Sequence, residues 1–499
     1  MADLTPPPHI VLIITDQQRL DTIAALGASG YQTPHLDRLC REGVAFTQCH
    51  TPSPVCCAAR ASLFRGQYPH TTGVYTNFEP WSPTWVSSLA DAGYHCVNIG
   101  KMHTNPYDAP GGFHQRLVVE NKDRPLFLDE HPRAWHDEWD KALRARKRVK
   151  PSRYTRAAAD AAGFRDALGC FTWELDDDLH PDTFVGETAC WWLRERQATS
   201  PLFLQIGFPG PHPPYDPTAE DLARFADTRF DVPQVSADEL DMQPPLHAGI
   251  RGSMSTFNVD SVAWRPDAMP DDLLRLRRHY AANVWMIDRQ VGAILQALDD
   301  RGMFDNTVLL FCSDHGDALG EHGHIQKWTM YDAVTRVPCI AWAPGRIPAT
   351  APDDALVQLH DLAPTVLDFA GVPVPAHWQS RSMHARLTTG AWPADAPPRE
   401  AVYAELSRDH LQTAVEYVLM RRDRRWKLVL YPGTDDGELY DLSSDPHERH
   451  NLWRDPAHAG RIADLTHEAL TWRTLSHHRA TRRPTPRPQQ PMKLPSAKG

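Results

Sequence analysis

The sequence predicts an α/β protein in which a mostly parallel sheet is sandwiched by helices. Several apolar runs are continuous rather than alternating, which is typical of strands buried on both faces. These runs cover residues 9–15, 94–99, 202–208 and 307–313. Residues 271–300 carry apolar side chains at helical spacing, and residues 361–371 show the same pattern over a shorter stretch. Strands that alternate with helices favour a parallel sheet covered on both sides.

Length and composition limit the class of protein. A chain of 499 residues can bury a large core and a smaller module. The net charge of -11 argues against a general nucleic-acid binder, and no apolar run approaches the roughly 20 residues that a membrane span needs. Residues 1–8 show no signal-peptide pattern, and nine cysteines, an odd number, indicate reduced thiols. We therefore expect a cytoplasmic protein with no nucleic-acid or membrane partner; a periplasmic location stays open.

Each predicted strand leads directly into polar residues. In chain order these are Asp16 and Gln17, Lys101 and His103, His212, and Asp314 with His315. Because ligands of such sheets bind beyond the carboxyl ends of the strands, these side chains are candidates for one active site. Lysine offers a compact positive charge and histidine exchanges protons near neutral pH. Taken singly, each would more simply be an exposed lysine or a packed histidine.

The strand-end carboxylates also suggest a metal site. Asp16 and Gln17 follow one strand, and Asp314 and His315 follow another that is distant in sequence. Carboxylate and amide oxygens favour a hard divalent cation such as calcium, magnesium or manganese. A single aspartate after a strand is more often a helix cap or a turn former, so the prediction depends on the joint placement of all four residues.

A cysteine at the start of a short predicted helix is the most informative local feature. Pro52 and Pro54 disfavour a helix in the residues before Cys56, and Gly66 is a residue type at which helices commonly end. Free backbone N–H groups at such a helix start favour an anion, and Arg60, one turn later, can point back to the same place. This arrangement suits a nucleophile that attacks a sulfate or phosphate ester. For an isolated pair, a buried cysteine beside a surface arginine would be the simpler interpretation.

Residues 51–74 resemble the signature of the type I sulfatases of the alkaline phosphatase superfamily. In that family a cysteine in a Cys-x-Pro/Ala-x-Arg context is oxidised to formylglycine. Cys56 and Arg60 match this motif, and the run from Gly66 to Pro69 also follows the family pattern. Ala58 stands where most members have proline. The resemblance implies a formylglycine-generating maturation enzyme as a partner, and that enzyme must accept alanine at this position.

The resemblance implies a role for each candidate residue. It places one divalent metal, calcium in the first place, on Asp16, Gln17, Cys56, Asp314 and His315. It makes Cys56, as formylglycine, the nucleophile, and the remaining catalytic residues are Arg60, Lys101, His103, His212 and Lys327. Most family members have aspartate at the position of Gln17 and often asparagine at the position of His315. The combination found here is similar to that of the phosphonate monoester hydrolases, which can use manganese. Metal identity and substrate class therefore stay open.

The resemblance also implies a division into domains. We expect an alkaline-phosphatase-like catalytic domain over residues 1–385 and a smaller C-terminal α+β subdomain, with an antiparallel sheet and a helix, over residues 386–475. Residues 476–499 form a basic, proline-rich tail that we expect to be disordered or to pack on a partner subunit. Residues 105–183 and 215–267 depart from the family pattern, and the second stretch has little helical or strand period. We expect both to shape a substrate pocket.

Three functions compete at this point. The first is hydrolysis of small-molecule sulfate monoesters, in the manner of an arylsulfatase, by a metal-bound formylglycine hydrate with S–O cleavage. The second is hydrolysis of phosphonate monoesters or phosphodiesters on the same scaffold. The third is a non-catalytic relative in which Cys56 is never oxidised. A homo-oligomer is compatible with all three.

Overall fold

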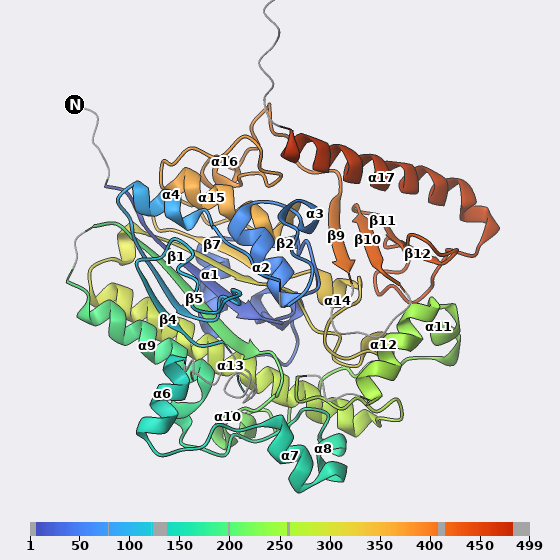
Figure 1. Ribbon diagram of the computed structural model, residues 1–499, viewed down its shortest axis with the longest axis horizontal. Coiled ribbons are helices and arrows are strands. Elements are labelled where there is room, and N and C mark those ends of the chain that lie inside the picture. The colour runs from blue at the N-terminus through green and yellow to red at the C-terminus, as the bar shows by residue number, and fades with distance from the viewer. Residues whose placement is uncertain are drawn as a thin grey trace, which may run out of the picture.

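The computed structural model describes residues 6–77, 79–120, 122, 137–197, 200–256, 260–407 and 415–482, which form a large and a small sheet (Figure 1). Across the large sheet, the eight strands in these ranges are β4 (Gln115–Val118), β3 (His95–Gly100), β5 (Leu202–Pro211), β1 (His9–Asp16), β6 (Thr307–Ser313), β7 (Cys339–Trp342), β2 (Val44–His50) and β8 (Asp353–Gln358). All neighbours are parallel except at β7, which runs antiparallel to β6 and β2. The predicted mostly parallel sheet is confirmed.

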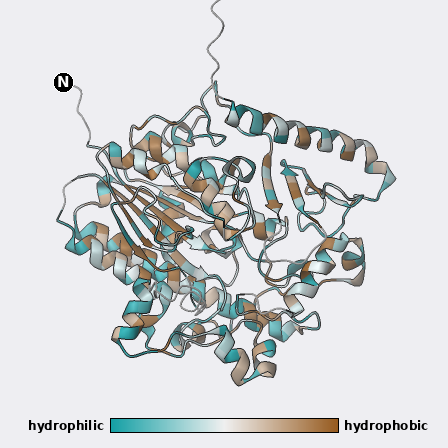
Figure 2. Cartoon of the chain, in the orientation of Figure 1, coloured by the Kyte–Doolittle hydropathy of each residue, from teal (hydrophilic) through white to brown (hydrophobic). Residues whose placement is uncertain are grey.

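The core lies on both faces of this sheet, because successive strand residues point into different helix layers. On β1, Val11 and Ile13 pack in one layer and Leu12 packs in the other, and all three are 0% exposed. The first layer is built by α1 (Pro34–Glu42), α9 (Pro181–Glu195) and α13 (Pro270–Asp300). The second is built by α2 (Cys56–Arg65), α4 (Val86–Asp91), α15 (Leu362–Phe369) and α16 (His384–Thr389). Figure 2 shows the strands between these layers as largely hydrophobic.

The two stretches that depart from the family pattern contain short helices. The first holds α6 (Glu138–Ala145), α7 (Arg153–Ala159) and α8 (Ala161–Ala167), besides β4 and the start of α9. The second holds α10 (Ala219–Ala223), α11 (Ala237–Met242) and α12 (Pro245–Thr256). Residues 215–267 therefore form helices although their sequence shows little helical or strand period. Several of these helices begin at local side-chain caps, such as Ser236 on Glu239, rather than at a long apolar period.

The smaller sheet is antiparallel, with strand order β12 (Gly437–Asp441), β11 (Trp426–Leu430), β10 (Tyr417–Arg422) and β9 (Val402–Ser407). Helix α17 (Ala459–Thr481) packs on it through Leu465 and Ala469, so the predicted C-terminal α+β unit is present (Figure 1). The helix continues beyond residue 475, into the segment predicted as a tail. The rest of that tail, residues 483–499, lies outside the described residues.

Ion pairs and short helices join the two units. Asp332, at the start of α14 (Asp332–Thr335), lies 2.6 Å from Lys427 and 3.0 Å from Arg422 of the small sheet. Helix α3 (Pro69–Thr72) contacts α17. No disulfide links any of the nine cysteines, all of which belong to the described chain. Within the described ranges, no helix combines the length and apolarity needed to cross a bilayer.

Candidate active site

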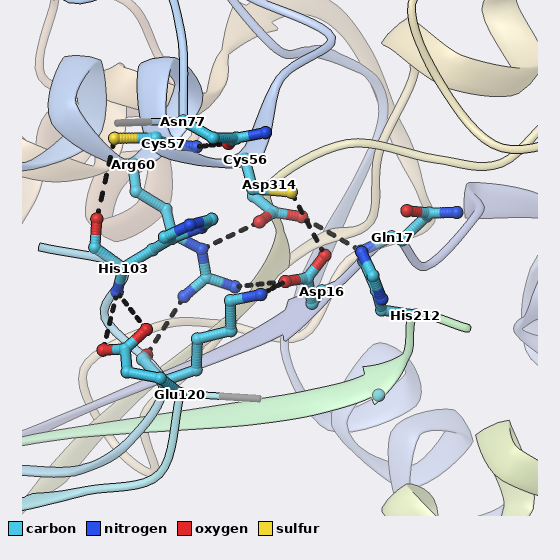
Figure 3. Close-up of polar contacts among 12 residues, drawn as sticks. Asp16, Gln17, Cys56, Cys57, Arg60, Asn77, His103, Glu120, His212 and Asp314 are labelled. Atoms are coloured by element: carbon cyan, nitrogen blue, oxygen red, sulfur yellow. Dashed lines mark hydrogen bonds and ion pairs between the residues drawn. The ribbon is translucent and has the colours of Figure 1, made fainter. Parts of the chain in front are cut away.

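The candidate residues meet at the carboxyl edge of the large sheet, where β3, β5, β1 and β6 are neighbours. Asp16 is the last residue of β1, and Asp314 follows β6 directly. Lys101 and His212 follow β3 and β5 in the same way. Four strand ends that are far apart in sequence therefore bring buried polar side chains to one place (Figure 3).

Cys56 enters this place as the first residue of α2. The helix is preceded by Val55 in an extended conformation and ends at Gly66, whose φ of 64° is easily adopted by glycine. The backbone N–H of Cys57 donates to Oδ1 of Asn77 at 3.2 Å (Figure 3). The predicted start and end of this helix are both confirmed.

Asp16, Cys56, Asp314 and His315 form a buried group whose candidate ligand atoms all lie within 4.8 Å of one another. The Sγ atom of Cys56 is 3.6 Å from Oδ1 of Asp16 and 3.1 Å from Nε2 of His315. Carboxylate and imidazole donors that converge at this spacing can bind a divalent cation. Among the described His, Cys, Asp and Glu residues, no other group of three or more meets the same condition.

The imidazole of His315 is held in the form that can bind a metal. Its Nδ1 lies 2.9 Å from the carbonyl oxygen of Gly316, which assigns the ring proton to Nδ1. The lone pair of Nε2 then points at Cys56 and the carboxylates. Burial lowers the pKa of His315, which keeps the ring neutral. A neutral imidazole anchored through its other nitrogen is the usual metal-binding form.

Gln17 adds an oxygen beside this group. Its Nε2 donates to Asp317 at 2.7 Å, which directs Oε1 toward Nζ of Lys327 at 3.4 Å. The backbone N–H of Gln17 donates to Oδ1 of Asp314 at 3.0 Å, and this contact accompanies a φ of 70° at Gln17. Left-handed backbone is uncommon for glutamine and is kept where the surroundings require it. With two carboxylates, an imidazole and this amide oxygen, the donor set fits a hard divalent cation.

Buried cations surround the carboxylates. Arg60 lies 2.8 Å from Asp314 and 3.7 Å from Asp16, and Nζ of Lys101 lies 2.5 Å from Asp16 (Figure 3). Burial alone would raise the pKa of Asp16, but Lys101 and the other positive groups of the site outweigh it and hold that pKa well below its usual range. Asp16 therefore stays ionised although no part of it is exposed.

The thiol of Cys56 is not an activated nucleophile. Nζ of Lys327 lies 3.0 Å from Sγ, yet burial, and next the charge of Asp16, raise the pKa of the thiol to about 12. Reactive cysteines have lowered pKa values and some exposure, whereas Cys56 is only 1% exposed.

His212 and Lys327 lie on one side of Cys56. Nζ of Lys327 is 3.2 Å from Nε2 of His212, while Nδ1 of His212 lies 2.8 Å from the carbonyl oxygen of Pro213 and donates to it. Asp260 closes this side, with Oδ2 3.3 Å from Nε2 of His212. Burial, followed by the charge of Lys327, lowers the pKa of His212.

Glu120 supports the loop that carries Lys101 and His103. The backbone N–H of His103, at a φ of 61°, lies 3.1 Å from both carboxylate oxygens of Glu120 (Figure 3). Burial raises the pKa of Glu120, and the charge of Lys101 opposes this shift. The carboxylate therefore fixes the backbone on which both predicted catalytic side chains stand.

The structure brings every residue predicted for the site to this place. Four further residues, which the sequence did not predict, also lie there. These are Asn77, Glu120, Asp260 and Asp317. Asp317 could have been recognised, because it lies three positions after Asp314 in the same strand-end segment. His322 and His324 belong to a separate packing cluster: Nδ1 of His322 lies 2.7 Å from Glu239, and Nε2 of His324 lies 2.9 Å from His247.

Comparisons with known proteins agree with this geometry. A family model described as Sulfatase matches residues 8–372, and one described as N-sulphoglucosamine sulphohydrolase, C-terminal, matches residues 320–474. The chain is 28% identical to an arylsulfatase of Clostridium perfringens, over 91% of this chain and 92% of that protein. It is 28% identical to a choline-sulfatase of Rhizobium meliloti, over 93% and 85%. The solved phosphonate monoester hydrolase of Silicibacter pomeroyi has the same fold, with a TM-score of 0.76 at 22% identity over 94% and 96% of the two chains.

Proposed function

The chain belongs to the sulfatase family, and from this premise we propose that it hydrolyses sulfate monoesters with cleavage of the sulfur–oxygen bond. The observation that carries the proposal is the position of Cys56, at a helix start between the candidate metal ligands and Lys327. Two relatives named as sulfatases, one for aryl esters and one for choline sulfate, support a small sulfate ester as substrate.

We propose that Cys56 is converted to formylglycine by a maturation enzyme that accepts Ala58. The burial and raised pKa of the thiol support this, because they leave the unmodified sulfur unreactive. The hydrated aldehyde would supply the attacking hydroxyl group. Calcium held by Asp16, Gln17, Asp314 and His315 would make that hydroxyl more acidic.

The charged side chains then bind the ester and move protons. Lys101 and Lys327 would neutralise the negative oxygens of the sulfate group, and Arg60 would keep Asp16 and Asp314 in place. Nε2 of His212 or Nζ of Lys327 would give a proton to the departing alcohol oxygen. His103 would take up a proton when sulfate is released.

Peptide mass spectrometry and a matched assay test the proposal. Protein from its native host should show the Cys56 peptide as formylglycine, and it should hydrolyse 4-nitrophenyl sulfate in proportion to the converted fraction. An unmodified Cys56 in every preparation would instead support a non-catalytic relative. An inactive protein with complete conversion would count against sulfate esters as substrates.

Hydrolysis of phosphonate monoesters or phosphodiesters is the second candidate. Gln17 and His315 favour it, because this pair is similar to the ligands of phosphonate monoester hydrolases. Rates on an aryl sulfate and on the matching aryl phosphonate monoester, measured side by side with calcium and with manganese, separate the two functions. A higher kcat/KM for the phosphonate would make it the main activity.

A further inference from the structure

The carboxylate of Asp317 lies at the centre of a buried hydrogen-bond cluster beside the candidate metal ligands. Its Oδ2 accepts from Nε2 of Gln17 and from the phenol of Tyr215, both at 2.7 Å. Its Oδ1 accepts from the backbone N–H groups of Leu319 at 3.0 Å and Gln326 at 2.9 Å. The residue is 0% exposed. Because a carboxylate can accept about four hydrogen bonds, these donors occupy both oxygens of Asp317.

The two polar neighbours of the Gln17 side chain fix the direction in which its amide faces. Asp317 lies at one end of the amide and offers acceptor oxygens. Nζ of Lys327 lies at the other end, 3.4 Å from Oε1, and offers donor hydrogens. A reversed amide would place its NH₂ group against an ammonium and its oxygen against a carboxylate. Figure 3 shows the amide oxygen of Gln17 turned toward the candidate metal ligands and the nitrogen turned away.

The backbone holds Asp317 itself in one orientation. Leu319 and Gln326, the two donors to Oδ1, have φ values of 44° and 64°, and the N–H of Ala318 donates to the carbonyl oxygen of Gln326 at 2.7 Å. Left-handed backbone at residues other than glycine persists where the surroundings fix it, often at functional sites. Oδ1 is therefore committed to the backbone, and Oδ2 is the atom that faces Gln17.

The direction of this amide decides whether Gln17 can bind a cation. Of the proposed oxygen ligands, Gln17 alone is uncharged, and only the oxygen end of its amide has lone pairs to offer. A carboxylate that accepts from the nitrogen end also polarises the amide and makes its oxygen a stronger ligand. The negative charge that an aspartate ligand would carry at position 17 is thus present one hydrogen bond further away, on Asp317.

We propose that Asp317 is a positioning residue that keeps the amide oxygen of Gln17, rather than its NH₂ group, directed at the metal. Asp317 itself contacts neither the metal nor the substrate in this arrangement. The inference deepens the proposed function and rests on its metal site, because the direction of the amide matters only if that site holds a cation.

Asp317→Asn tests the inference because it reverses the amide of Gln17. The two backbone N–H groups retain the remaining oxygen of the new side chain, so its NH₂ group faces Gln17 and can donate only to the oxygen there. Calcium is titrated calorimetrically into metal-free protein, with the state of Cys56 matched among variants by mass spectrometry. The Kd for calcium should rise about 10–100-fold, the usual effect of replacing a residue that orients a metal ligand. Tyr215→Phe is the matched control: it removes the other donor to Oδ2, leaves Gln17 in place and should bind calcium as wild type does.

Exchanging the acid and the amide separates orientation from charge. In the double variant Gln17→Glu/Asp317→Asn, the amide at position 317 donates to the carboxylate at position 17, whose second oxygen faces the metal. Asp317→Asn should therefore cause no loss of calcium affinity in the Gln17→Glu background, in contrast to its effect on wild type. An equal loss in both backgrounds would overturn the inference, because Asp317 would then act through its charge or through the fold and not through the amide.

A crystal structure of the wild type with calcium decides the matter if Asp317→Asn does not fold. The amide oxygen of Gln17 should lie about 2.3–2.6 Å from the ion while Nε2 still donates to Asp317. A Gln17 side chain that has left Asp317 would overturn the inference.

The outcomes separate this inference from the proposed function, because neither measurement depends on turnover. Unchanged calcium affinity in Asp317→Asn, with sulfate hydrolysis intact in wild type, would overturn the role of Asp317 alone. A fully converted wild type that binds calcium through Gln17 but cleaves none of the esters would overturn the proposed function alone. A wild type that binds no divalent cation would overturn both.

Discussion

The guanidinium of Arg60 donates a 2.8 Å hydrogen bond to the carboxylate of Asp314, although 254 positions separate the two residues in the chain. Both side chains are 0% exposed. The contact joins the middle of helix α2 to the residue that follows strand β6. The nucleophile position on α2 and the candidate metal ligands after β6 are thereby held in one geometry.

Replacing Arg60 should therefore destabilise the fold as well as the site. Arg60→Met leaves the buried carboxylate of Asp314 without its arginine and that of Asp16 with Lys101 as its remaining partner. Removing one partner of a buried ion pair typically costs about 3–5 kcal/mol in the free energy of unfolding. Arg38→Met is the control, because the Arg38–Glu42 pair is about half exposed and such pairs contribute ~0–1 kcal/mol. Urea unfolding of the two variants checks this, and equal losses would contradict it.

Substitution of Cys56 should abolish turnover without unfolding the protein. Cys56→Ala removes the modifiable side chain, and Cys56→Ser leaves a hydroxyl that cannot form an aldehyde hydrate in the same way. We expect activity below about one thousandth of wild type, of the size of losses seen when a nucleophile is removed. Cys57→Ser, next along the helix, should retain activity. Initial rates on 4-nitrophenyl sulfate measure the loss of turnover in each variant. Retention of most activity in Cys56→Ala would refute the mechanism.

Metal removal should lower both activity and thermal stability. Asp16 and Asp314 belong to one buried group, and chelation removes the cation that would lie between them. A metal present at 100 times its Kd adds about 2.7 kcal/mol to the stability of the folded state. Calcium should raise the Tm of wild type, and His315→Gln should reduce that shift. His360→Gln removes a buried histidine outside the site and should leave the shift unchanged. A wild-type Tm indifferent to calcium, magnesium and manganese would count against the metal site.

Glu438 gives the stability of the protein a specific acid dependence. Burial would raise the pKa of Glu438, but His247 and hydrogen bonds from Tyr431 and Tyr440 lower it from 4.5 to about 2. Because the folded-state pKa is lower than the unfolded one, the stabilisation is complete above about pH 5 and is lost as the pH falls toward 2. The expected loss between pH 6 and pH 4 is about 1 kcal/mol.

Glu438→Gln should remove this part of the acid dependence. Urea unfolding at pH 6, 5 and 4 measures it, with Glu174→Gln, an exposed glutamate, as the control that keeps the wild-type slope. The same slope in Glu438→Gln as in wild type would show that Glu438 does not carry the effect.

The sequence was sufficient for the elements whose pattern is local. The apolar run of β1 and the polar residue at its end predict both the strand and the place of Asp16. The loop before Cys56 predicts the helix start in the same way. Strand β7 was not predicted, because Cys339–Trp342 is too short to show a period.

Asp260 and Glu120 could not be found in this way. Asp260 reaches His212 through left-handed backbone at residues that usually avoid it, and nothing in the neighbouring residue types signals this conformation. Glu120 acts on the backbone of His103 rather than on a side chain. Contacts of this kind depend on the packed fold, so only the structure reveals them.

The order of strands in the large sheet also affects when Cys56 can be reached. Among the strands that border the site, β6 is the last to leave the ribosome, and Asp314, His315 and Lys327 come after it. Until those residues arrive, the thiol lacks much of the wall that leaves it 1% exposed in the finished fold. The modification that we propose for Cys56 would therefore have to precede completion of the sheet.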